Sequence, residues 1–281
     1  MRFVTYRFEG ELSPGVIEGD EVRAISTATL REYIALAPHE RIAWHSSDDP
    51  LPLCDVRIEV PLLPARNVFC VGRNYLDHAI EGARAAGREL KLPPAPAFFT
   101  KAPTAIAGPD TTLHLQASLS SEYDYEAELA VVIGAKCKNL TEDEAIHAIF
   151  GYTALNDVTA RNIQRERGQW FKGKSLDYTC PIGPWIVSRD EIGDPQQLEI
   201  AFRRNGIEKQ RANTAQMIFG VAHIVADLSQ GLTLLPGDVI ATGTPAGVGF
   251  ARTPPEFLNN GDVMEVEIER IGVLRNTVSI A

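Results

Sequence analysis

Two glutamates, Glu126 and Glu128, stand where a strand would begin, in the apolar run 126–134. Residues two apart on a strand project from the same face, so the two carboxylates would lie side by side. Carboxylates held together repel each other and raise each other's pKa, whereas a hard divalent cation accepts them as oxygen ligands. The alternative is a pair of solvated glutamates on one strand face, as Glu265 and Glu267 illustrate.

A third carboxylate, Asp157, ends the mostly apolar run 151–157. Buried aspartates are rarely left unpaired. The simple partner is Arg161, four residues on, through a salt bridge. The functional interpretation makes Asp157 a third metal ligand, since three carboxylates and water molecules suit Mg²⁺ or Mn²⁺.

His78 and Glu81 are three residues apart, so they are neighbours on one face of a helix. A carboxylate beside a histidine orients the ring and raises its basicity, as a general base requires. The alternative is a surface pair on a solvated helix. The following stretch, 82–92, has few large apolar residues and suits a mobile lid.

Two further segments could contact an anion. Lys172 and Lys174 flank a glycine, which favours either an anion contact or an ordinary basic loop. The segment 243–249 is rich in glycine and follows a strand, so its backbone N–H groups could approach a ligand, or it could be a turn.

Short strands dominate the elements expected to position these residues. Hydrophobic alternation and turn residues predict strands over 2–8, 15–18, 21–25, 68–72, 126–134, 151–157, 239–242, 264–268 and 274–280. Helical spacing predicts helices over 30–37 and 221–228, and the capping box that begins at Thr141 predicts another that ends at Gly151. Because regular βαβ alternation is missing, we expect a β-dominated α+β fold. A small β-rich domain, 1–62, would precede a catalytic domain, 65–281, after Pro61 and Pro64.

The composition of the chain argues against several classes of function. The net charge of −10 argues against a general nucleic-acid binder, which needs a basic surface. The four cysteines form no CxxC pair, so neither a zinc site nor a disulfide framework is indicated. The sequence has no apolar run near the roughly 20 residues that span a bilayer and no signal-peptide pattern, so we expect a cytoplasmic protein.

Taken together and in this order, these segments resemble the fumarylacetoacetate hydrolase superfamily, in particular its bacterial-type members with a small N-terminal domain. The resemblance covers roughly residues 66–280. Its most specific parts are 71–75 with His78, the segment 124–130, the segment 156–161, the segment 172–175 and the segment 236–245.

The resemblance implies a mixed β-roll as the catalytic domain and a role for each candidate residue. Glu126, Glu128 and Asp157 look like the Mg²⁺ (or Mn²⁺) ligands. His78 and Glu81 look like the catalytic dyad on a lid, with Lys174 as the catalytic lysine beside the metal. The residues that look like substrate contacts are Arg73, Tyr75, Arg161, Gln164 and Thr244.

The implied reaction is the hydrolysis of a C–C bond in an acylpyruvate-like or diketo acid. The small anionic 2-oxo acid would chelate the metal and pass through an enolate, with the dyad activating water. The same site would also suit a 2-oxo acid decarboxylase of the oxaloacetate type or a hydroxymuconate-type isomerase. The resemblance further implies a homodimer, and the charge and hydropathy arguments above leave nucleic acid and membrane out of the expected partners. Arg73, Arg84 and Arg88 could meet a second carboxylate or the hydroxyl groups of a sugar acid, or could simply be solvated.

Overall fold

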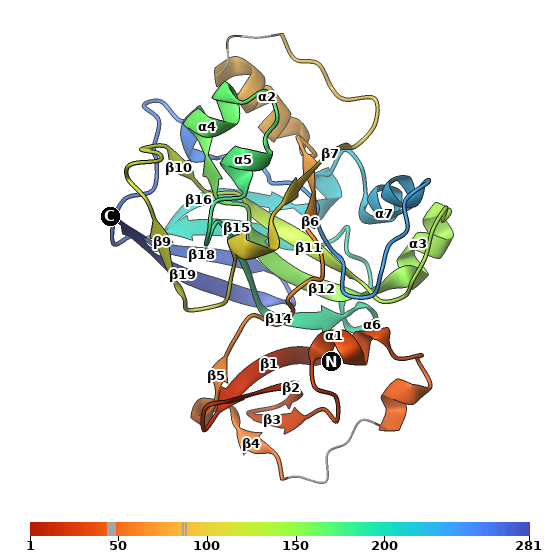
Figure 1. Cartoon of the computed structure of the whole chain (residues 1–281). Coiled ribbons are helices and arrows are strands. Elements are labelled where there is room, and N and C mark those ends of the chain that lie inside the picture. Colours follow the sequence, from red (N-terminus) through yellow and green to blue (C-terminus); the bar gives the residue numbers. More distant parts are fainter. Residues whose placement is uncertain (44–48, 86, 88) are drawn as a thin grey trace.

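The computed structural model describes residues 1–43, 49–85, 87 and 89–281 (Figure 1). A smaller N-terminal unit lies at one end of the molecule, and a larger body of strands carries most of the helices on its outside (Figure 1). Strands predominate over helices, which confirms the prediction of a β-dominated α+β fold.

The largest sheet runs through both parts of the chain. Its order is β4 (Leu51–Pro52), β3 (Glu21–Ala24), β2 (Glu11–Glu18), β1 (Arg2–Phe8), β14 (Cys180–Ser188), β12 (Ile149–Asn156), β11 (Ala127–Ile133), β17 (Val239–Ala241), β6 (Val68–Gly72) and β7 (Ala97–Lys101). At its side, β5 (Arg57–Ile58) pairs with β1 and β8 (Ile106–Ala107) pairs with β14. The sheet is mixed, because β17 is parallel to β6 and antiparallel to β11.

The N-terminal unit is joined to the main body through this sheet. Strand β1 pairs antiparallel with β14, with Phe3 opposite Ile186. Phe3 and Leu30 also belong to the same buried cluster as Phe150 and Ile186 of the main body. The domain boundary at residues 62–65 stays a prediction, since backbone pairing and core packing both cross it.

A second sheet packs against the first. Its order is β16 (Ile207–Asn213), β15 (Glu199–Arg204), β18 (Val263–Ile268), β19 (Gly272–Ile280) and β9 (Thr112–Leu115). Met264, Val266 and Ile268 alternate with less buried glutamates along β18, as the sequence pattern predicts. These three side chains share one core cluster with Leu129 and Val131 of β11, so the core lies between the two sheets. A short pair, β10 (Tyr123–Asp124) with β13 (Thr159–Ala160), lies beside them.

The helices lie at the periphery of the sheets (Figure 1). They are α1 (Leu30–Ala35), α2 (Leu76–Ala85), α3 (Glu142–Ala148), α4 (Arg161–Glu166), α5 (Phe171–Lys174), α6 (Arg189–Ile192) and α7 (Val221–Ser229). Short 3₁₀ turns are η1 (Glu40–Ala43), η2 (Leu53–Asp55), η3 (Pro103–Ala105), η4 (Thr214–Gln216) and η5 (Gly249–Ala251). Among the described helices, none has the length and apolar character needed to cross a bilayer.

Two sequence predictions need correction. The helix that begins after Thr141 ends at Ala148, whereas the capping pattern suggested an end at Gly151. Gly151 lies inside β12, where a Cβ atom would overlap the carbonyl oxygen of Val187, so glycine serves strand packing there. The lysines at 172 and 174 lie on the short helix α5 and not in a loop.

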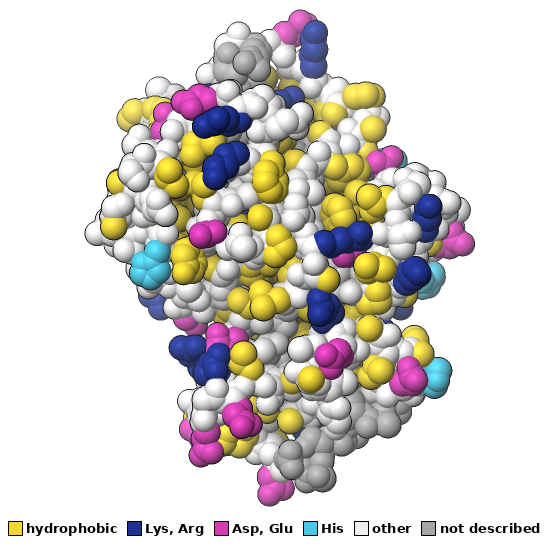
Figure 2. Space-filling view, viewed as in Figure 1, with side chains coloured by type: hydrophobic (Ala, Val, Ile, Leu, Met, Phe, Trp, Pro, Cys, Tyr) yellow, Lys and Arg dark blue, Asp and Glu magenta, His cyan; other side chains and the backbone are white. Residues whose placement is uncertain are grey.

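Charged side chains of both signs are interspersed on the face of the molecule shown in Figure 2. That face therefore offers no continuous basic surface of the kind that binds a nucleic-acid backbone.

Candidate active site

Strand pairing brings the three predicted carboxylates together. Ala127 of β11 lies opposite Asn156 of β12, so Glu126 and Asp157 meet just beyond the paired residues. The backbone N–H of Asp157 donates to the carbonyl oxygen of Glu126 over 2.8 Å. Glu128 accepts a hydrogen bond from the backbone N–H of Gly243 at 2.7 Å. Carboxylate oxygens of Glu126, Glu128 and Asp157 lie within 4.8 Å of one another, and all three residues are buried.

Two buried lysines neutralise part of this charge. The Nζ atom of Lys174 lies 2.7 Å from a carboxylate oxygen of Glu126 and 2.7 Å from one of Asp157. The Nζ atom of Lys101 lies 2.6 Å from the other oxygen of Asp157. Sequence reasoning missed Lys101, because a lysine that ends a short strand resembles an ordinary surface residue. Lys101 reaches the carboxylates only because β7 pairs with β6 in the folded sheet.

The carboxylates do not share one electrostatic environment. Burial raises the pKa of Glu126, but the charges of Lys174, Arg161 and His78 outweigh burial and lower it to about 2. For Glu128, burial and then the charges of Asp157 and Glu126 all act in the same direction and raise its pKa well above the ordinary value. A cation bound between the three groups would remove the repulsion that acts on Glu128. The donor set of buried carboxylate oxygens fits a divalent cation such as Mg²⁺ or Mn²⁺.

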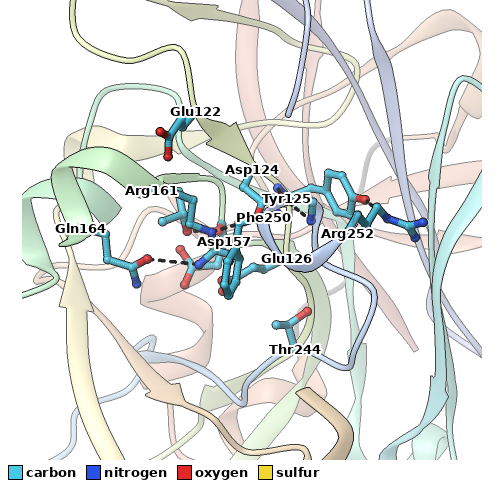
Figure 3. A network of polar contacts seen from close by, with 12 residues as sticks. Glu122, Asp124, Tyr125, Glu126, Asp157, Arg161, Gln164, Thr244, Phe250 and Arg252 are labelled. Carbon is cyan, nitrogen blue, oxygen red and sulfur yellow. Dashed lines mark hydrogen bonds and ion pairs between the residues drawn. The ribbon is translucent and has the colours of Figure 1, made fainter. Parts of the chain in front are cut away.

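Arg161 occupies a different place from the one that sequence spacing suggested. Its Nε atom lies 2.8 Å from Oδ2 of Asp124, and an Nη atom lies 2.7 Å from Oε1 of Glu126. It also donates to Oε1 of Gln164 at 3.2 Å (Figure 3). The alternative interpretation of Asp157, a salt bridge with Arg161, is therefore wrong, because the two lysines pair with Asp157 instead.

The predicted dyad is formed on helix α2. The Nδ1 atom of His78 lies 2.9 Å from Oε1 of Glu81. Both side chains are mostly buried, with 11% and 14% exposed, which separates them from the solvated pair His223 and Glu142 at 41% and 59%. The backbone N–H of Gly247 contacts both carboxylate oxygens of Glu81, at 3.1 and 2.9 Å. The helix thus docks onto the glycine-rich segment that follows β17.

The predicted substrate contacts have distinct surroundings. Tyr75 is buried and its hydroxyl has no hydrogen-bond partner among the described residues, while burial and then the charge of Glu128 raise its pKa. Thr244 is buried, and its hydroxyl oxygen accepts a hydrogen bond from Gln210 at 2.8 Å. Arg73 is exposed, and its guanidinium lies 5.4 Å from the centre of the Trp170 ring. Substrate contact stays a prediction for each of them.

The proposed lid is described only in part. Helix α2 extends through Arg84 to Ala85. Arg88, one of the arginines considered for a second acidic group, lies outside the described residues, as does Ala86. The mobility of the segment 82–92 stays a prediction.

This fold and this cluster define a class of protein. Residues 67–279 match the family described as fumarylacetoacetate (FAA) hydrolase C-terminal, and the chain belongs to the fumarylacetoacetate hydrolase superfamily. The family resemblance inferred from the sequence motifs is thereby confirmed.

Similar proteins span nearly the whole chain. An oxaloacetate tautomerase of Bacillus subtilis (strain 168) is 42% identical over 96% of this chain and 89% of its own length. A 2,4-didehydro-3-deoxy-L-rhamnonate hydrolase of Sphingomonas sp. (strain SKA58) is 40% identical over 99% and 96%, respectively. The solved structure of a fumarylacetoacetate hydrolase from psychrophilic Exiguobacterium antarcticum covers all of both chains at 40% identity with a TM-score of 0.84. The superfamily thus includes both hydrolases and tautomerases among the relatives of this chain.

Proposed function

We propose that this protein is a divalent-metal-dependent hydrolase that cleaves a C–C bond in a small acylpyruvate-like or diketo acid. The observation that supports it best is the buried cluster of Glu126, Glu128 and Asp157, whose oxygens lie within 4.8 Å of one another. When bound there, Mg²⁺ or Mn²⁺ would supply positive charge beside the keto oxygen of a 2-oxo acid.

The charges around the cluster favour an anionic substrate. Four buried carboxylates, on Asp124, Glu126, Glu128 and Asp157, face three buried cationic side chains, on Lys101, Lys174 and Arg161. One formal negative charge is in excess, so a divalent cation would leave the site with one formal positive charge. The carboxylate of a 2-oxo acid would balance that charge. An uncharged ketone would leave it unpaired in a buried site.

The side chains of the chain would divide the reaction between them. His78, held by Glu81, would take a proton from water, whose oxygen would attack the distal carbonyl carbon. The C–C bond would break with its electron pair moving to the carbon of the 2-oxo acid part, giving an enolate, while the other part leaves as a carboxylic acid. Lys174 would donate hydrogen bonds to the developing negative charge, and protonation of the enolate carbon would complete the 2-oxo acid.

A second candidate is a tautomerase or decarboxylase acting on an oxaloacetate-type acid. The relative that is 42% identical over 96% of this chain carries the name oxaloacetate tautomerase. Tautomerisation needs the same enolate and one proton transfer, but no attacking water. His78 and Glu81 would then move the proton between the substrate carbon and oxygen.

A substrate screen with Mg²⁺ tests both candidates. It should compare acylpyruvates, oxaloacetate, diketo-deoxy sugar acids and hydroxymuconates, each with and without a chelator. Equal amounts of a 2-oxo acid and a carboxylic acid would identify the hydrolase. A change in the enol absorbance of oxaloacetate, without such products, would favour the tautomerase. Metal-independent turnover, or none on any of these acids, would overturn the proposal.

A further inference from the structure

A short backbone segment, 247–250, lies between two carboxylates from different parts of the fold. The backbone N–H of Gly247 contacts Glu81 of helix α2. Two residues on, the backbone N–H groups of Gly249 and Phe250 donate to Asp124 at 2.7 and 3.1 Å. The segment therefore connects the dyad helix to the strand that leads into Glu126.

Neighbouring backbone approaches the segment closely at both of its glycines. Gly247 has a φ of 106°, and a Cβ atom there would overlap the carbonyl oxygen of Lys209. A Cβ atom on Gly249 would overlap the carbonyl oxygen of Glu256 and lie 2.6 Å from Oδ1 of Asp124. Because closely packed interiors transmit strain, we expect a displacement at Asp124 to reach Gly247 through this segment.

Asp124 also contacts the other half of the site. The residue is fully buried, and its Oδ2 atom accepts a hydrogen bond from Nε of Arg161 at 2.8 Å. The same guanidinium lies 2.7 Å from Glu126 and 4.4 Å from the centre of the Phe250 ring. Figure 3 shows Asp124, Arg161, Glu126 and Phe250 close together, and the Arg161 guanidinium lies over the Phe250 ring.

We infer that Asp124 is a positioning residue that fixes the dyad, His78 and Glu81, relative to the three-carboxylate cluster. This inference rests on the proposed function. Asp124 acts at one end by holding Arg161 against Glu126, and at the other by holding the segment whose Gly247 N–H orients Glu81. A charged carboxylate suits both tasks, because hydrogen bonds to an ionised acceptor are the stronger kind.

Asp124→Asn is the first test, because it keeps the size of the side chain and removes its charge. Partners that orient functional groups contribute about 10- to 100-fold. We expect kcat on the best substrate to fall by about that factor, with KM changed less than about threefold. The matched control is Glu122→Gln, which removes a partly exposed carboxylate two residues away that pairs with Arg165. The control should retain the kcat of the parent protein.

A double-mutant cycle separates positioning from general damage. If Asp124 acts through Glu81, Asp124→Asn should lower kcat only slightly further in a protein that already carries Glu81→Gln. Losses that multiply in the double variant would overturn the inference. Gly249→Ala provides a second variant, because its Cβ atom would overlap both the carbonyl oxygen of Glu256 and Oδ1 of Asp124 and should push the segment off Asp124 while leaving the charge of Asp124 in place. The fall in kcat that Gly249→Ala causes should likewise vanish when Glu81→Gln is already present. A fall in kcat of the same size in both backgrounds would count against the inference.

Hydrogen exchange tests the connection without any substrate, so its outcome is independent of the proposed function. Asp124→Asn should speed exchange in the segment 247–250 and in helix α2, and should leave helix α7 unchanged. Unchanged exchange in helix α2 would show that Asp124 does not hold the dyad, even if the enzyme proves to be a hydrolase. If Asp124→Asn speeds exchange in helix α2 but the parent protein has no activity on 2-oxo acids, the structural connection between Asp124 and helix α2 stands and the proposed function is rejected.

Discussion

The Nζ atom of Lys101 lies 2.6 Å from Oδ1 of Asp157, and neither side chain is exposed to solvent. Lys101 also donates to the carbonyl oxygen of Val158 at 3.1 Å, so it holds both the side chain of Asp157 and the backbone that follows it. With Lys174 on the second oxygen, the carboxylate of Asp157 is fixed from two sides. We expect these contacts to orient the carboxylate of Asp157 for its proposed role as a metal ligand.

Removing Lys101 should destabilise the fold. Lys101→Met leaves part of the charge of Asp157 uncompensated in the core, and breaking a buried pair in this way costs about 3–5 kcal/mol. Urea unfolding should show this loss in the free energy of unfolding. Lys172→Met, at an exposed lysine on α5, serves as the control and should change it by less than about 0.5 kcal/mol. Equal effects of the two substitutions would show that the Lys101 pair is not important for stability.

Removing Glu128 should weaken metal binding. Glu128→Gln deletes one ligand charge from the cluster, and we expect the affinity for Mg²⁺ to fall at least about tenfold. Since the ligand must be ionised, Mg²⁺ binding to the parent protein should release protons, and this release should shrink in the variant. Calorimetric titration in buffers of different ionisation enthalpy measures both quantities. The control is Glu265→Gln, on the partly exposed face of β18, and an unchanged affinity in Glu128→Gln would place the metal elsewhere.

The stability of the metal-free protein should depend on pH through the same residue. Burial, Asp157 and Glu126 raise the pKa of Glu128 above its ordinary value of 4.5. A group whose pKa is raised by folding stabilises the folded state below its unfolded pKa, and this contribution is lost as the pH rises through the folded value. Thermal unfolding with a chelator should therefore show stability falling from about pH 5 upward. Glu128→Gln should flatten this fall, and an identical fall in the variant would assign it to another group.

Local sequence patterns predicted the parts of the site that depend on periodicity. Glu126, the residue before β11, and Glu128 within it bring their carboxylates together as the alternation of side chains predicts, and His78 meets Glu81 because residues three apart are neighbours on a helix. The capping box at Thr141 also forms as predicted. Each of these features is decided within a few residues of the chain.

Contacts between distant segments could not be predicted in this way. Lys101 reaches Asp157 across 56 residues, and Gly249 reaches Asp124 across 125. Gly151 illustrates the same limit, since its role depends on how closely Val187 of β14 approaches. Local sequence spacing suggested Asp157 as the salt-bridge partner of Arg161. In the folded protein, Arg161 forms salt bridges with Asp124 and Glu126.

The assembly predicted from the family resemblance is a homodimer. The chain has a mass of 30.8 kDa, so light scattering at micromolar concentration should give a species of about twice that mass. A single species near 30.8 kDa would contradict the prediction.

Because the dyad and the carboxylate cluster are proposed to have separate roles, we expect His78→Ala to affect hydrolysis more than metal binding. His78 contacts Glu81 within α2, whereas the three carboxylates proposed as metal ligands lie on and beside β11 and β12. The substitution should leave Mg²⁺ and substrate-analogue binding nearly intact. It should lower kcat for acylpyruvate hydrolysis by roughly 10²–10⁴-fold, which is the usual contribution of a positioned acid–base group. Decarboxylation of oxaloacetate needs no activated water, so it should be affected much less.

The chain supplies a matched control in His223, whose Nδ1 atom lies 2.9 Å from Glu142, the same separation as in the dyad but on an exposed surface. His223→Ala should leave both activities unchanged. Measuring kcat on both substrates for the parent protein and the two variants therefore isolates the buried pair. Equal losses on the two substrates in His78→Ala would refute the activation of water and would favour a general positioning role for helix α2. A variant that retains full activity on both substrates would place the base elsewhere, because the 2.9 Å contact between His78 and Glu81 would then be no more catalytic than the one between His223 and Glu142.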